Sequence, residues 1–101
     1  NFITNNITKG EIKKINVSDK KFDLTNKIVC IENADPGFDF IFSHKIKGLV
    51  TKYGGFNSHM SIRCSELNIP AAIGVGDEIF ESLYNKNRLE LNCENKKLIL
   101  I

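Results

Sequence analysis

Short apolar runs alternate with polar turns along the chain, and their lengths and spacings separate strands from helices. The run from Ile28 to Ile31 is continuous, which predicts a strand over residues 27–32 that is covered on both faces. Similar short runs predict a second strand over residues 48–52 and a third over residues 71–75. Each of these three strands is followed by a segment with a longer, helical period.

Apolar residues spaced three and four apart predict a helix after each of these strands. The first covers residues 38–45, with Asp35 as its cap and Pro36 near its first position. The second covers residues 58–67 and the third residues 77–83. The apolar side chains expected to contact the core are Phe38, Ile41, Phe42, Met60, Ile62, Leu67, Ile79, Phe80 and Leu83.

Strands are also expected at both ends of the chain. Alternating apolar residues predict an edge strand over residues 11–17, and residues 22–24 form either a second short strand or a turn. Paired strands over residues 88–92 and 97–101 close the chain as a hairpin. This order of elements is typical of an α/β fold with a central, mostly parallel sheet. The strands at the two ends indicate a second, smaller β layer.

Length and composition fit a single globular domain. The chain has 101 residues, of which 42% are hydrophobic and 26% charged, and its formal net charge of +2 is too small to indicate a nucleic-acid surface. No apolar run approaches the length of a membrane span, and no signal-peptide pattern is present, so we expect a cytoplasmic protein. Because the chain starts at Asn1 rather than Met, we expect a fragment of a larger polypeptide, although processing would look the same.

The cysteines and histidines do not form a metal-binding pattern. Cys30, Cys64 and Cys93 are widely separated and are expected to be buried, reduced thiols. The only histidines are His44, expected at an exposed helix end, and His59. A zinc site needs clustered ligands, so we expect no metal bound to this chain.

One junction carries candidate chemistry. The segment from Tyr53 to His59 reads Tyr-Gly-Gly-Phe-Asn-Ser-His and joins the second predicted strand to the second predicted helix. Free backbone N–H groups and the positive end of the helix dipole favour an anion such as phosphate at such a junction. A neutral imidazole there can attack a phosphoryl group and hold it as phosphohistidine. The alternative is a histidine that only caps the helix or packs against it.

These residues also resemble a known signature. Thr51-x-x-Gly54-Gly55-x-x-Ser58-His59-x-x-Ile62, followed by Glu66-Leu67-x-Ile69-Pro70-Ala71-x-x-Gly74, resembles the active-site signature of the phosphohistidine domain of the phosphoenolpyruvate-utilising enzymes. That family includes phosphoenolpyruvate synthase, pyruvate phosphate dikinase, enzyme I of the sugar phosphotransferase system and rifampicin phosphotransferase. The resemblance covers roughly residues 28–101 and implies the swivelling β/β/α fold, in three layers, for the single domain 1–101.

The resemblance implies that His59 is the phosphoryl carrier, with Nε2 as the attacking nitrogen. Gly54 and Gly55 would turn the loop and bring N–H groups to the phosphate, or would serve as a plain turn. Ser58 caps the helix and can also donate its hydroxyl to a phosphoryl oxygen. Thr51 either contacts the phosphate, positions the loop, or is a buried strand residue.

Arg63 lies one helical turn after His59, where it either places positive charge beside the phosphate or is a solvated surface residue. The chain departs from the family pattern at several positions. Asn57 replaces a threonine that is a regulatory phosphorylation target in dikinases, and Ser65 replaces a usual arginine. Met60 and Ser61 replace small residues after the histidine. Asp35 and Asp39 are expected to be capping and surface groups rather than catalytic acids.

The leading hypothesis is a mobile phosphohistidine domain of a larger phosphotransferase. Its partners would be an ATP-binding domain and a phosphoenolpyruvate/pyruvate or other acceptor domain, which would also bind the ATP and Mg²⁺ that this domain itself does not need. The departures from the signature motivate an alternative, a non-catalytic interaction or regulatory module. A stand-alone phosphocarrier is a third possibility. The sequence leaves the final acceptor and the direction of transfer open.

Overall fold

The computed structural model describes residues 1–16, 23–55, 57–83 and 86–101. Its strands form one seven-stranded sheet in the order β1-β5-β4-β3-β2-β6-β7. The strands are β1 (Phe2–Ile3), β2 (Ile7–Lys14), β3 (Lys27–Asn33), β4 (Gly48–Tyr53), β5 (Ala71–Ala72), β6 (Arg88–Asn92) and β7 (Lys97–Leu100). The described residues form three further elements, which are the 3-10 helix η1 (Pro36–Ser43) and the α-helices α1 (His59–Leu67) and α2 (Asp77–Ser82).

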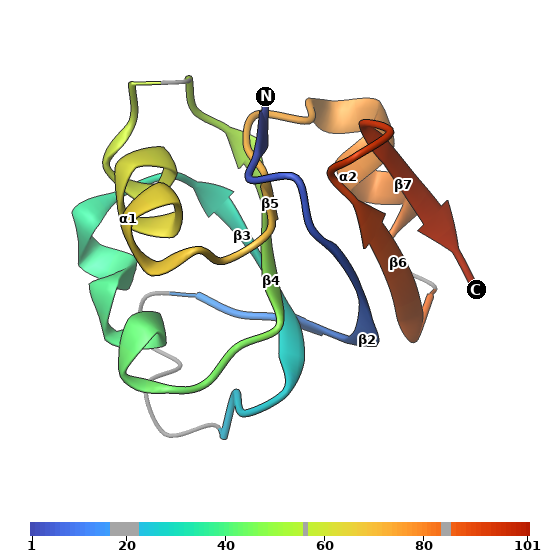
Figure 1. Ribbon diagram of the computed structural model, residues 1–101, viewed down its shortest axis with the longest axis horizontal. Helices are drawn as coiled ribbons and strands as arrows, with labels where there is room; N and C mark the ends of the chain where they lie inside the picture. The colour runs from blue at the N-terminus through green and yellow to red at the C-terminus, as the bar shows by residue number, and fades with distance from the viewer. Residues whose placement is uncertain (17–22, 56, 84–85) are drawn as a thin grey trace.

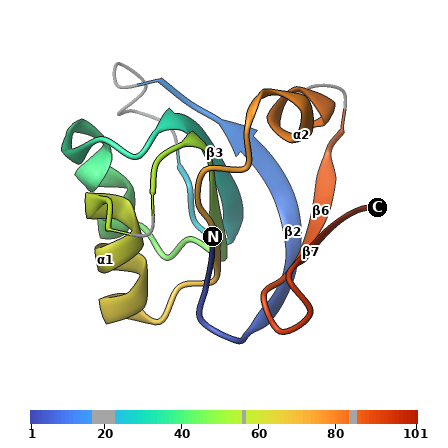
Figure 2. The ribbon, with the colours of Figure 1, turned by 90° about the horizontal axis from the view of Figure 1, so that it is seen from above.

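The centre of the sheet is parallel, as the order of elements predicts. Strands β2, β3, β4 and β5 pair in parallel, whereas β1 pairs with β5, β6 with β2, and β7 with β6 in antiparallel fashion. The long strand β2 curves from the central strands to the β6–β7 hairpin (Figure 2). The expected second β layer is therefore the curled end of this same sheet.

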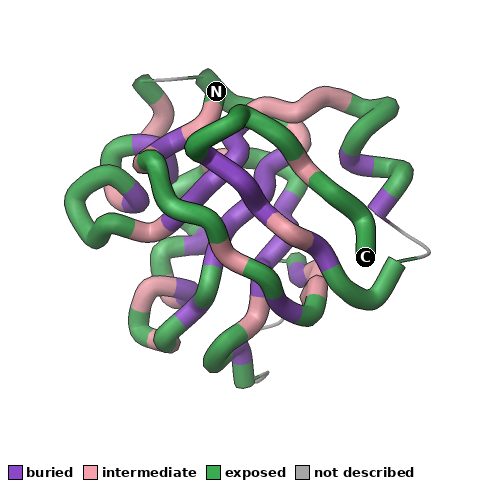
Figure 3. Tube along the Cα trace, turned by 45° about the vertical axis from the view of Figure 1, so that its right-hand side comes forward, coloured by how far each residue is buried: buried purple, intermediate pink, exposed green. Residues whose placement is uncertain are grey.

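The two faces of the central strands bury different clusters. Helices η1 and α1 cover one face, and α2 with the β6–β7 hairpin lies on the other side (Figure 1). Within β3, Val29 and Ile31 face the first cluster, while Ile28 and Cys30 face the second. This alternation is the two-residue period of a strand, and it explains why the run is apolar throughout. Buried residues concentrate in the central strands (Figure 3).

Several strand predictions need correction. The first long strand covers residues 7–14 rather than 11–17, and it lies between β3 and β6 rather than at an edge of the sheet. The predicted strand over residues 71–75 is paired only at Ala71–Ala72. A positive φ of 70° at Gly74 turns the chain away two residues later. Residues 23–24 are not in a strand, and residues 17 and 22 lie outside the described residues. The short strand β1 was not predicted, because two residues carry no period.

The helix predictions were right in place and partly wrong in facing. Asp35 caps η1, accepting a hydrogen bond from the Gly37 N–H at 2.7 Å, but this helix is 3-10 and begins at Pro36. Met60, Phe80 and Leu83 are buried as expected. The side chains wrongly expected in the core are Ile62, Leu67 and Ile79, which are 52%, 45% and 46% exposed.

The remaining side-chain expectations concern histidine and cysteine. His44 is half-buried rather than exposed, and its Nδ1 accepts a hydrogen bond from the Leu24 N–H at 3.4 Å. The three cysteines are free and buried, and burial raises the pKa of both Cys30 and Cys64 to about 12. Thiols with so high a pKa are almost entirely protonated at neutral pH and are therefore unreactive. No helix in the described part of the chain is long and apolar enough to cross a membrane.

Candidate functional site

The glycine loop after β4 is held by a close backbone contact. Gly54 has a φ of 133°, and a Cβ on it would lie 2.7 Å from the Ala34 Cβ. Gly74 approaches it from the end of β5, where a Cβ would lie only 2.2 Å from the Gly54 carbonyl oxygen. No side chain fits in that space, so the closeness of the two backbones requires glycine at position 74.

Gly55 differs from Gly54. Its φ is not positive, and a Cβ there would meet nothing within 4 Å. Its carbonyl accepts a hydrogen bond from the Ser58 N–H at 3.0 Å, which closes the turn into α1. Local backbone conformation therefore does not explain Gly55, whereas open space above the backbone is what a close-bound anion needs. Phe56, which follows Gly55, lies outside the described residues.

Helix α1 begins as its sequence predicts. Ser58 has an extended backbone and accepts a hydrogen bond from the Ser61 N–H at 3.4 Å, so it is the N-cap. His59 is the first helical residue, and the first turn contains no acidic residue. The helix ends at Asn68 in the left-handed conformation. The positive end of the nine-residue helix thus lies at His59 without a carboxylate from its own first turn.

Thr51 is fully buried in the second half of β4. Its Oγ1 accepts a hydrogen bond from the Gly74 N–H at 2.8 Å, and its carbonyl accepts one from the Val75 N–H at 3.0 Å. These bonds hold the turn after β5 against the glycine loop. Among the roles expected for Thr51, the geometry supports the positioning of the loop.

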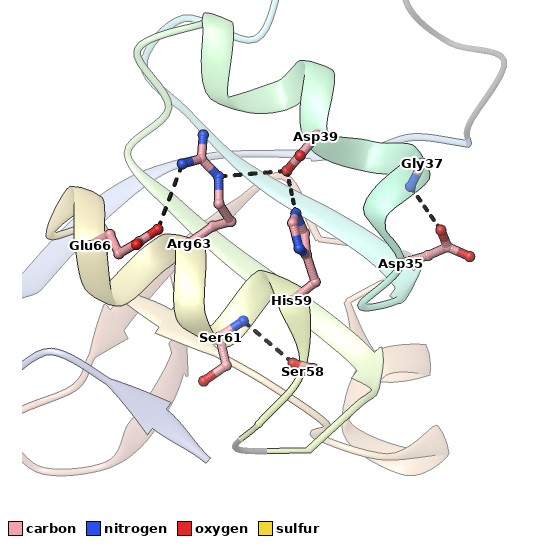
Figure 4. Close-up of polar contacts among 8 residues, drawn as sticks. All are labelled: Asp35, Gly37, Asp39, Ser58, His59, Ser61, Arg63 and Glu66. Atoms are coloured by element: carbon pink, nitrogen blue, oxygen red, sulfur yellow. Dashed lines mark hydrogen bonds and ion pairs between the residues drawn. The ribbon is translucent and has the colours of Figure 1, made fainter.

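The side chain of His59 lies between two structural elements (Figure 4). Its Nε2 lies 2.8 Å from the Asp39 Oδ1 on η1, and the two side chains are 36% and 46% exposed. Asp39 was expected to be only a capping or surface group. The sequence signal for it is weak, because an acid in the first turn of a helix is ordinary and twenty residues separate it from His59.

Arg63 contacts two carboxylates. Its Nε lies 3.7 Å from the Asp39 Oδ1 and its Nη1 3.7 Å from the Glu66 Oε1, while the guanidinium carbon lies 5.2 Å from the centre of the Phe42 ring (Figure 4). The Nε atom is buried, and it makes no hydrogen bond with any of the described residues. Arg63 is therefore beside His59, but Asp39 stands between their charges.

A second polar cluster fixes the other side of the glycine loop. The Tyr53 hydroxyl donates to the Asp77 Oδ1 at 2.8 Å, and the Lys52 Nζ lies 3.4 Å from the same oxygen. The hydrogen bond from Tyr53, together with Lys52, lowers the pKa of the Asp77 carboxyl below its ordinary value. This cluster ties the start of α2 to the end of β4.

The structure brings most of the predicted site together where the parallel strands β3 and β4 end. Gly54 and Ser58 line a shallow hollow with Ala34 and Asp35, and His59 follows Ser58 directly. Arg63 contacts Asp39, which in turn contacts His59. Thr51 is buried under the glycine loop, where it accepts a hydrogen bond from the Gly74 N–H. No three His, Cys, Asp or Glu side chains of the described residues are grouped as a metal site. The arrangement offers a nucleophile, a helix N-terminus and a shaped loop.

Known proteins resemble this chain in sequence and in fold. The family described as "PEP-utilising enzyme, mobile domain" matches residues 23–96, which include the glycine loop and His59. The solution structure of Enzyme I (nEIt) superposes with a TM-score of 0.63 at 22% sequence identity over 85% of this chain, and so has the same fold. The matched region is 34% of that structure's chain. No curated protein matches the chain.

The family match covers well over half of the chain, and the structural match supports the swivelling α/β fold that the resemblance implies. The matched residues contain the whole signature, from Thr51 to Gly74. This chain therefore belongs to the family of mobile domains of phosphoenolpyruvate-utilising enzymes.

Proposed function

We propose that this chain is the phosphoryl-carrying domain of a larger phosphotransferase, with His59 as the transiently phosphorylated residue. The observation that carries the proposal is the place of His59: the first residue of α1, directly after a glycine loop, with a partly exposed side chain. A helix N-terminus favours the phosphoryl oxygens, and an imidazole is the nucleophile that can hold the group covalently.

The transfer is a displacement at phosphorus. The lone pair of Nε2 forms the bond to phosphorus, while the bond from phosphorus to the donor oxygen breaks and that oxygen keeps the electron pair. The other ring nitrogen, Nδ1, keeps its proton during the step. Delivery is the same reaction in reverse, with an acceptor oxygen attacking the phosphorus of phosphohistidine. The protein's contribution is positioning and charge rather than further covalent chemistry.

The neighbouring residues support that step in different ways. Ser58 and the N–H groups of the first turn of α1 would contact phosphoryl oxygens, with Gly55 leaving room for the group. Gly54 and Thr51 would fix the loop, and Arg63 would supply positive charge beside the carrier nitrogen.

The two stations of the carrier would lie in other domains of the same cytoplasmic enzyme. One would be an ATP-type nucleotide site with Mg²⁺, and the other a phosphoenolpyruvate/pyruvate site or a different acceptor. This chain would supply the carrier residue, His59. In this proposal the domain is a mobile part of the enzyme and does not complete a catalytic cycle alone.

The test is phosphate mapping on the full-length enzyme. The protein is incubated with ATP–Mg²⁺ and, separately, with phosphoenolpyruvate, and intact mass and acid-labile phosphate are measured. We expect one phosphoryl group on His59, lost in acid and stable in base, and none in His59→Ala. His44→Gln is the matched control, because it removes the other histidine and should leave the phosphorylation unchanged. Turnover that survives in His59→Ala would refute the carrier role.

A non-catalytic module is the second candidate, and two observations favour it. Asp39 occupies Nε2 of His59, and Ser65 stands where the family usually has arginine. This candidate predicts a folded full-length protein in which neither donor adds mass to His59. The same experiment therefore separates the two functions.

A further inference from the structure

The hydrogen bond between His59 and Asp39 involves the ring nitrogen that the carrier role requires. The distance from Nε2 to the Asp39 Oδ1 is 2.8 Å. An ionised carboxylate can only accept hydrogen bonds, so Nε2 carries the proton in this contact. A protonated Nε2 has no lone pair to donate to phosphorus. His59 is therefore blocked at Nε2 for as long as Asp39 stays in place.

The negative charge of Asp39 opposes phosphorylation of His59, as the proton on Nε2 does. An incoming phosphoryl group is negative, and it would have to approach the point where the Asp39 carboxylate already lies. Like charges at such short range repel one another. The site in this state is suited to a resting histidine and not to phosphohistidine.

Arg63 offers the Asp39 carboxylate a second position. Its Nε is buried, lies 3.7 Å from the same Oδ1, and makes no hydrogen bond with any described residue. A buried donor without a partner is costly, and a small movement of the carboxylate away from His59 would satisfy it. The Asp39 side chain is 46% exposed, so it has room to move.

Resting on the proposed function, we propose that Asp39 is a two-position gate for phosphoryl transfer. In the resting chain its carboxylate covers His59 Nε2; in the reactive chain it pairs with the Arg63 Nε and leaves Nε2 to the phosphoryl group. The Nε2 proton moves to solvent, and Nδ1 takes one up, so the ring stays neutral and only its tautomer changes. Nε2 then attacks phosphorus with its lone pair.

The test uses the 101-residue chain and phosphoramidate, a small phosphoryl donor that needs no partner domain. Nε2 forms the bond to phosphorus, the phosphorus–nitrogen bond of the donor breaks, and ammonia leaves. Phosphorus-31 NMR assigns the modified ring nitrogen, and peptide mapping by mass gives the rate at each histidine. His44 in the same tube is the internal reference. The variants are Asp39→Asn and Asp39→Ala, with Glu94→Gln as matched control, because Glu94 is an exposed acid in the turn between β6 and β7.

We expect both Asp39 variants to be phosphorylated at His59 Nε2 about fivefold faster than the unmodified chain, relative to His44. Glu94→Gln should match the unmodified chain within about twofold. Unchanged or slower phosphorylation at Nε2 in both Asp39 variants would overturn the gate. The His44 rate and the circular dichroism spectrum report whether a variant is folded.

The second position is tested by a double variant. Arg63→Gln removes the partner of the displaced carboxylate, so it should slow Nε2 phosphorylation about threefold when Asp39 is present. In the Asp39→Ala background the same change should have a clearly smaller effect. Equal effects in the two backgrounds would mean that Arg63 does not act through Asp39, which overturns the two-position gate.

The outcome is independent of the test of the carrier role. If full-length enzyme never phosphorylates His59 but Asp39→Ala still accelerates the reaction with phosphoramidate, the carrier function fails while the covering contact stands. In the opposite case the full-length enzyme phosphorylates His59, but Asp39→Ala slows phosphorylation of Nε2 by the enzyme's own donor and by phosphoramidate alike. The carrier function then stands, and Asp39 holds the ring in place instead of gating it.

Discussion

The α-helices α1 and α2 begin in opposite ways, although each follows a parallel strand of the same sheet. Helix α1 has a Ser58 cap and no acidic residue in its first turn. Helix α2 begins at Asp77 after the N-cap Gly76, which has no side chain to cap it, and its first turn contains Asp77 and Glu78. The positive end of α2 is thus neutralised by its own carboxylates, whereas that of α1 is left for a group from outside the helix.

The two junctions also touch each other. Gly54 before α1 and Gly74 before α2 meet backbone to backbone, and Thr51 hydrogen-bonds across the gap. The contact of Tyr53 with Asp77 adds a second tie. The α2 junction therefore braces the α1 junction, and only the braced one carries candidate chemistry.

The largest effect is expected at the contact between the loops. Gly74→Ala would place a Cβ 2.2 Å from the Gly54 carbonyl oxygen, in a residue whose φ is positive. We therefore expect the free energy of unfolding to fall by about 3 kcal/mol. Gly76→Ala is the control, because its φ is positive but its surroundings are open, and it should cost about 1 kcal/mol. Urea unfolding gives both values. Equal losses would show that the brace is not a steric contact.

Loss of the α1 cap should lower the free energy of unfolding by less than Gly74→Ala does. Ser58→Ala removes the acceptor for the Ser61 N–H, and we expect a loss of about 1 kcal/mol in the free energy of unfolding. Ser58→Asp keeps a cap but adds negative charge beside His59, so its stability should stay near that of the unmodified chain while phosphoryl transfer slows. Urea unfolding and phosphorylation rates on the same samples separate capping from phosphate contact. Equal transfer rates in Ser58→Asp and the unmodified chain would contradict the anion site.

A carboxylate at the start of α1, like those at the start of α2, should raise the stability of the protein and lower the rate of phosphoryl transfer to His59. Asn57→Asp puts a carboxylate just before the cap, which should stabilise the helix by about 0.5 kcal/mol through its dipole. The same charge should slow phosphorylation of His59 about fivefold, because it competes with the phosphoryl group. Glu78→Gln, at the start of α2, should leave the phosphorylation rate unchanged. A transfer rate that does not respond to Asn57→Asp would break the comparison.

The smallest effect is expected at Asp77 and depends on pH. The hydrogen bond from Tyr53, with Lys52, lowers the pKa of Asp77 in the folded chain below its ordinary value. Its stabilising contribution is therefore present above that ordinary value and is lost as pH falls through the lowered one. Thermal melting of Asp77→Asn should show a lower Tm than the unmodified chain at pH 6, and the difference should vanish in strong acid. A difference that grows in acid would reverse the sign and exclude this contact.

Much of this domain follows from local sequence. The continuous run from Ile28 to Ile31 was enough to predict a strand covered on both faces, and the loop from Tyr53 to His59 was enough to predict a capped helix with a histidine at its start. These features depend on neighbours along the chain. The faces of short helices were less predictable, and Ile62 is exposed because helix α1 turns that side away from the sheet.

The tertiary structure alone decided the partners of His59. Strands β3 and β4 are parallel neighbours, so the helices that follow them, η1 and α1, lie on the same face of the sheet and bring Asp39 to His59. Nothing in the sequence of the residues between Asp39 and His59 indicates that the two side chains are close. The sequence by itself determined which residue is the candidate nucleophile and where its helix begins, because both are local. Which side chain covers that nucleophile depends on how strands pair, and only the folded chain sets that.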